Sequence, residues 1–100
     1  MTYLWFTYRD PEEDDPTEMY VELDRDRMET RRVEFFLGGV CFSYGDERGH
    51  EEVLSKEPYP ENIYSLNTDD VEVKAISPSF FREIWNQAQE RPDGFLSLFV

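Results

Sequence analysis

Residues 19–37, MYVELDRDRMETRRVEFFL, decide the fold of this chain of 100 residues. Apolar and polar side chains alternate in Met19–Asp24 and again in Thr30–Leu37, which is the pattern of strands with one buried face. The polar residues Arg25–Met28 between these segments favour a turn. In the first segment we expect Met19, Val21 and Leu23 to point inward and Tyr20, Glu22 and Asp24 outward. The stretch therefore predicts two strands of an antiparallel sheet.

Three further segments are predicted strands. Thr2–Tyr8 is apolar on both faces, which favours a central strand covered on each side. Gly38-Gly39 predicts a two-residue hairpin turn into Val40–Tyr44, because glycine adopts positive φ at little cost. Val71–Ile76 alternates in the same way as the first two strands.

A helix is predicted near the end of the chain. Ser77 is a good N-cap and Pro78 suits the first helical position. Apolar residues then recur at helical spacing, at Phe80, Phe81, Ile84, Trp85 and Ala88. We expect one α+β domain over residues 1–100, with a mostly antiparallel sheet of four to five strands and one C-terminal helix packed across a face.

The last residues, Phe95–Val100, are almost wholly apolar. They favour one of two arrangements. The segment packs on the sheet as an edge strand, or it is an exposed patch that joins a second copy of the chain as a homodimer.

Composition limits the function. With 23 acidic and 10 basic residues, the formal net charge is −13, which argues against direct binding of nucleic acid or an anionic membrane. One cysteine and one histidine argue against a disulfide framework and a Cys/His metal site, and we expect no cofactor. The residues show no leader and no apolar run long enough to span a membrane, so we expect a cytoplasmic protein.

Carboxylates are concentrated in two segments, Asp10–Glu18 and Asp46–Glu61. The first has six carboxylates in nine residues and no cation. It only faintly resembles a calcium loop, because Asp15 stands where glycine is needed and Val21 where the closing glutamate belongs. The segments are either solubilising loops or a binding site for a basic partner. The candidate partner-binding residues are Asp10, Glu12, Glu13, Asp14, Asp15, Glu18, Asp46, Glu47, Glu51 and Glu52.

The stretch Glu22–Glu34, ELDRDRMETRRVE, resembles a family of small bacterial proteins known only as a domain of unknown function. Ile76-Ser77 and Phe81–Trp85 fit the same pattern, so that the resemblance covers about residues 3–90 and leaves Phe95–Val100 as an extension. It implies a compact bacterial or phage-encoded domain and no known catalytic residue.

The sequence thus predicts a small acidic inhibitor and not an enzyme. It would bind and cover a basic surface of a nuclease, effector complex or toxin, as an anti-defence protein of the anti-CRISPR type or a toxin-immunity protein does. In this hypothesis carboxylates take the place of phosphates. The alternative is a housekeeping binding module for an unknown ligand, which would use a polar sheet face around Tyr20, Glu22 and Arg31.

Overall fold

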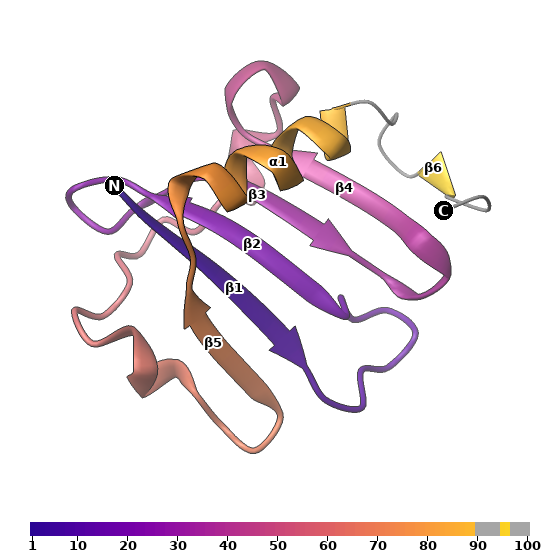
Figure 1. Cartoon of the computed structure of the whole chain (residues 1–100), viewed down its shortest axis with the longest axis horizontal. Helices are drawn as coiled ribbons and strands as arrows, with labels where there is room; N and C mark the ends of the chain where they lie inside the picture. Colours follow the sequence, from indigo (N-terminus) through magenta and orange to yellow (C-terminus); the bar gives the residue numbers. More distant parts are fainter. Residues whose placement is uncertain (90–94, 97–100) are drawn as a thin grey trace.

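The structure is a computed structural model that describes residues 1–89 and the backbone of residues 95–96. An antiparallel sheet of strand order β5-β1-β2-β3-β4-β6 lies behind one helix, α1 (Figure 1). The elements are β1 (Thr2–Tyr8), β2 (Glu18–Leu23), β3 (Glu29–Phe35), β4 (Val40–Tyr44), β5 (Val71–Ala75), α1 (Pro78–Gln89) and β6 (Phe95–Leu96). The predicted α+β fold, with a helix across an antiparallel sheet, is confirmed.

The central position predicted for the first strand is also confirmed. β1 pairs with β2 on one side and with β5 on the other. Leu4 and Phe6 pack with Val21 and Val73 on one face of the sheet, whereas Tyr3 and Trp5 lie against the helix side. A strand that is apolar on both faces therefore sits between two hydrophobic clusters.

Helix α1 begins as the sequence predicts. The backbone N–H of Phe80 donates to Ser77 Oγ at 3.1 Å, which satisfies one of the donors that have no partner at the start of a helix. Phe81, Trp85 and Ala88 are buried against Tyr20 and other residues of the sheet. The apolar stripe of the helix thus covers one face of the sheet (Figure 1).

The opposite face is covered by the connection between β4 and β5. Tyr59, Ile63 and Leu66 pack against the second hydrophobic cluster, which consists of Leu4, Phe6, Val21, Leu23 and Val73. Because α1 covers the other face, Tyr20 and Glu22 are only 4% and 5% exposed. The expectation that these two side chains point outward is therefore wrong. The alternation of apolar and polar residues separates the two faces of β2, and both of these faces are buried.

The β3–β4 hairpin turns at the predicted glycines, but its loop is longer than predicted. The Phe36 N–H donates to Val40 O at 2.8 Å, which leaves three residues, Leu37–Gly39, in the loop. Gly38 and Gly39 both have φ of +82°. The hairpin sets Phe35 opposite Cys41, so these residues share the α1 face and Phe42 lies on the other.

The apolar end of the chain contributes the two-residue strand β6. Val40 pairs with Leu96 and Cys41 with Phe95, so this part of the segment lies at the edge of the sheet. Residues 97–100 lie outside the described residues, and the predicted homodimer through this segment stays a prediction.

Candidate partner-binding surface

One end of the sheet gathers acidic residues from two distant parts of the sequence. The loop after β1 contributes Asp10, Glu12, Glu13, Asp14 and Asp15, which are all exposed, and the residues before β5 contribute Asp69 and Asp70. Arg9 joins the two segments: its backbone N–H donates to Asp70 O at 2.8 Å and its Nη1 to Asp69 O at 2.7 Å. We call these seven acidic residues the acidic end.

A small cavity of about 230 Å³ lies in the acidic end. It is lined by Tyr8, Arg9, Asp10, Pro11, Glu12, Asp15 and Asp70. The loop holds its own shape, because the Glu12 N–H donates to Asp15 Oδ2 at 3.2 Å and the Asp15 N–H to Glu12 O at 3.0 Å. Within residues 1–89, no ion pair neutralises a carboxylate of the acidic end.

Sequence reasoning missed Asp69 and Asp70 as members of this surface. They stand more than fifty positions from the loop in the sequence and belong to neither acidic segment. The sequence signal that could have identified Asp69 and Asp70 is the strand predicted to begin at Val71. Its antiparallel pairing with β1 places the residues before it beside the residues after Tyr8.

Glu18 lies at the same end of the sheet, where it pairs with Thr7, but its side chain is only partly exposed. Its Oε1 accepts hydrogen bonds from Trp5 Nε1 at 3.0 Å and from Tyr20 Oη at 3.4 Å. The carboxylate therefore faces the α1 side of the sheet and joins two aromatic residues that line the hydrophobic cluster.

The second group of predicted residues lies at the opposite end of the sheet. Asp46 is in a 3-10 helix, η2 (Asp46–Arg48), and Glu51 and Glu52 are in the next, η3 (Glu51–Val53). All three are exposed, whereas the side chain of Glu47 lies outside the described residues. β4 begins at the end of the sheet where β1 ends, and it runs toward the opposite end. The residues that follow β4 are therefore far from the loop after β1, and the two acidic segments do not form one patch.

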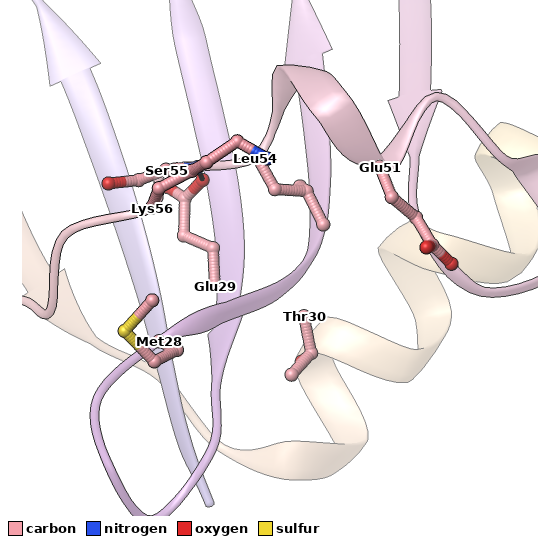
Figure 2. A pocket seen from close by; sticks show the side chains of 7 residues that line it. All are labelled: Met28, Glu29, Thr30, Glu51, Leu54, Ser55 and Lys56. Atoms are coloured by element: carbon pink, nitrogen blue, oxygen red, sulfur yellow. Dashed lines mark hydrogen bonds between the residues drawn. The ribbon is translucent and has the colours of Figure 1, made fainter.

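A larger cavity of about 390 Å³ lies beside Glu29 at this second end (Figure 2). The Glu29 side chain is fully buried and reaches from β3 to the connection. Its oxygens accept hydrogen bonds from the Ser55 N–H at 2.7 Å, from Arg32 Nη2 and from the Tyr59 hydroxyl. Burial and the hydrogen bond to Glu29 raise the pKa of Tyr59 well above its usual range. Internal donors thus occupy this carboxylate, so we interpret it as a structural anchor for the connection.

The polar sheet face of the alternative hypothesis lies beneath α1. Glu22 accepts two hydrogen bonds from Arg31, at 2.9 and 2.6 Å. The guanidinium carbon of Arg31 lies 5.0 Å from the ring centroid of Phe81 and 4.9 Å from that of Trp85. With Tyr20 and Glu22 buried, this face does not offer the exposed recognition surface that the alternative requires.

Several residues that carry the family resemblance make contacts that stabilise the fold. Asp24 Oδ1 accepts the N–H groups of Asp26 and Met28, at 2.8 and 3.0 Å, and so closes the turn between β2 and β3. Arg27 Nε donates to Tyr59 O at 2.7 Å. Together with Glu22 and Glu29, these residues attach the helix and the connection to the sheet.

Within the described residues, no group of three or more His, Cys, Asp or Glu side chains is arranged to hold a metal ion. None of the described helices is both long and apolar enough to cross a membrane. A family model, described as a domain of unknown function (DUF6881), matches residues 2–90. Among curated proteins and solved structures, none matches the chain.

Proposed function

The chain belongs to the DUF6881 family, a domain of unknown function, and from its surface charge we propose that it is a small acidic inhibitor. In this proposal it binds a basic surface of a nucleic-acid-handling enzyme or complex and covers it. An anti-defence protein of the anti-CRISPR type, or an immunity protein against a cationic nuclease toxin, would work in this way.

The acidic end is the observation that carries the proposal. Among residues 1–89, seven exposed carboxylates lie together with the guanidinium of Arg9 at one end of the sheet. Two like charges about 4 Å apart repel by about 1 kcal/mol in water and by about 4 kcal/mol where the effective dielectric constant is near 20. A basic partner relieves that repulsion when it binds, which favours association and makes it sensitive to salt.

Carboxylates at this density can take the place of a phosphate backbone. Duplex DNA presents one charge per about 1.7 Å of its axis, and a surface that binds it is matched to such spacing. Five acidic residues fall within the six positions 10–15, and Asp69 and Asp70 extend the group across the sheet end. Three of the remaining predicted residues, Asp46, Glu51 and Glu52, form a second and separate contact in this proposal.

The buried carboxylates favour binding over catalysis. Burial without a partner is what raises the pKa of a carboxyl group toward neutrality, as general acid catalysis requires. Glu22 instead has a partner in Arg31, and its pKa is lowered. The Glu29 side chain is held in a buried ion pair with Arg32. The carboxylates of the acidic end, by contrast, are exposed.

Capture from host lysate at low salt tests the proposal. The test variant carries Asp10→Asn, Glu12→Gln, Glu13→Gln and Asp14→Asn. The matched control removes four charges outside both proposed contacts, by substitution of the exposed residues Asp26→Asn, Glu57→Gln, Glu61→Gln and Glu83→Gln. We expect the wild type and the control to retain a basic nuclease or effector complex that elutes with salt, and the test variant to lose it. Equal capture by the test variant and the wild type would show that the acidic end is not the site.

A further inference from the structure

The cavity beside Glu29 lies between the start of β3 and the connection (Figure 2). Its volume of about 390 Å³ falls within the range of about 300–1,000 Å³ that is usual for small-molecule sites. Residues 28–30 line it from the side of the sheet, and Glu51 and residues 54–56 line it from the connection. Two separate segments of the chain therefore meet around it.

Two apolar side chains line the cavity, Met28 beside the start of β3 and Leu54 on the connection. Leu54 is 8% exposed, so it is held in place by the fold, whereas Met28 is half-buried. A methionine side chain is unbranched and adapts to ligands of different shape. The two residues would bury the apolar part of a ligand.

Most polar side chains of the lining already have partners within the protein. The carboxylate of Glu29 accepts from the Ser55 N–H at 2.7 Å. The hydroxyl of Ser55 donates to Glu57 O at 3.0 Å, and that of Thr30 donates to Glu22 Oε1 at 2.6 Å. A charged ligand would therefore find its partners among the other lining residues, which belong to the connection.

Glu51 and Lys56 are these other residues, and they carry opposite charges. Figure 2 shows them on opposite sides of Leu54. Both are exposed, and within residues 1–89 neither takes part in an ion pair. The carboxylate of Glu51 is thus available to an ammonium group, and the ammonium group of Lys56 to a carboxylate.

We propose that the cavity binds a small apolar zwitterion, namely a dipeptide with free amino and carboxyl ends. The ammonium end would pair with Glu51 and the carboxylate end with Lys56, while the side chains pack on Met28 and Leu54. An extended dipeptide spans about 7 Å, so its two charges are further apart than those of an amino acid. That separation suits partners on opposite sides of Leu54.

A basic side chain of a protein partner is the competing occupant, because Glu51 also belongs to the second contact of the proposed function. Lys56 disfavours that occupant, since a like charge lines the same cavity. The inference does not rest on the proposed function, because its ligand is a small molecule and is tested without a partner.

Titration with leucyl-leucine, followed by nuclear magnetic resonance at low ionic strength, tests the inference. This dipeptide has no net charge at neutral pH, so the overall negative charge of the protein neither attracts nor repels it. Glu51→Gln and Lys56→Gln should each weaken its binding about two- to fivefold, as expected for pairs of exposed charges. Glu57→Gln and Lys74→Gln are the matched controls, because these residues are exposed and do not line the cavity, and they should change nothing.

A second ligand shows which end pairs with which residue. N-acetyl-leucyl-leucine lacks the ammonium group, so Lys56→Gln should weaken its binding and Glu51→Gln should not. If Glu51→Gln weakens leucyl-leucine and Lys56→Gln strengthens it, the cavity accepts a cation and the inference is wrong.

The wild type alone also gives a decisive result. Leucyl-leucine is expected to shift the amides of Met28, Leu54 and Ser55 more than that of Tyr64, an exposed residue of the connection outside the cavity. Shifts confined to other parts of the protein, or no binding at millimolar concentration, would overturn the inference. Either result would leave the proposed function untouched, because the capture from lysate depends on the acidic end.

Discussion

The carboxylate of Glu22 on β2 and the guanidinium of Arg31 on β3 form an ion pair with two hydrogen bonds, beneath helix α1. The same guanidinium lies over the rings of Phe81 and Trp85. One side chain therefore joins a buried charge of the sheet to the aromatic face of the helix. Glu22 exposes only 5% of its surface, so its charge depends on Arg31 and Thr30 for stabilisation.

Replacement of Arg31 by lysine should destabilise the folded protein even though the positive charge is kept. An ammonium group cannot make the two parallel bonds to Glu22, and it does not stack as a plane on Phe81 and Trp85. We expect Arg31→Lys to lower the free energy of unfolding by about 1–3 kcal/mol. Urea denaturation of the two proteins measures the difference.

Arg25→Lys is the matched control, because Arg25 is an exposed residue of the turn between β2 and β3. It should change the free energy of unfolding by no more than about 0.5 kcal/mol. Equal losses in the two variants would mean that the geometry around Arg31 contributes nothing specific.

Acid should weaken the fold partly through Glu22. Burial raises the pKa of this carboxyl group, but hydrogen bonds from Arg31 and Thr30 and the charge of Arg31 outweigh burial, so its pKa lies below the usual value. A group with a lowered pKa in the folded state contributes stability above its unfolded pKa and loses it as the pH falls through the folded pKa. Glu22→Gln should be less stable than the wild type at neutral pH and lose less stability on acidification. Denaturation at a series of pH values checks this, and parallel curves for the two proteins would contradict it.

The hydroxyl of Tyr59 should hold the connection against the sheet. Tyr59→Phe removes the hydrogen bond to the buried carboxylate of Glu29, and a bond to a charged group contributes about 1.5–3 kcal/mol. We expect a loss of that size, together with faster amide hydrogen exchange in Ser55–Leu66. Tyr64→Phe, on an exposed ring, should leave both the stability and the exchange unchanged. If exchange rises equally across α1 and the connection, the hydroxyl would be contributing to the whole fold and not to a local attachment.

Local signals in the sequence predicted most of the fold. Ser77-Pro78 placed the start of α1, and the two apolar faces of Thr2–Tyr8 placed β1 at the centre of the sheet, because each is decided by neighbouring residues. The alternation in β2 was misleading for Tyr20 and Glu22. Their exposure depends on a helix more than fifty residues away, and the partner that makes a buried Glu22 tolerable is on another strand.

The candidate site was only partly predictable for the same reason. The loop Asp10–Asp15 stands out as a run of acids, whereas Asp69 and Asp70 join it only through the pairing of β5 with β1. The separation of the two acidic segments follows from the direction of β4. Charge runs are a property of neighbours in sequence, but their grouping on a surface is a property of sheet topology.

Gly45 and Gly49 offer a matched pair of backbone substitutions. Both have positive φ, of +91° and +71°, so alanine is strained at each by about 1–3 kcal/mol. A Cβ atom on Gly45 would also lie 2.3 Å from the backbone oxygen of Thr30, whereas one on Gly49 would meet nothing within 4 Å. Gly45→Ala should therefore lower the melting temperature much more than Gly49→Ala. Similar melting temperatures for the two variants would mean that the contact with Thr30 relaxes without cost.

Salt should stabilise the protein through the acidic end. The carboxylates of Asp10–Asp15, Asp69 and Asp70 repel one another across the ends of β1 and β5, and within residues 1–89 they have no cation in an ion pair to offset that repulsion. The Debye length falls to about 8 Å at physiological ionic strength, so added salt screens the repulsion between exposed charges of this group. The melting temperature of the wild type should rise from low to physiological salt, and the variant neutralised at Asp10, Glu12, Glu13 and Asp14 should rise less. A flat or falling melting temperature in the wild type would show that repulsion at the acidic end does not destabilise the folded state, because screening that repulsion would then bring no gain in stability.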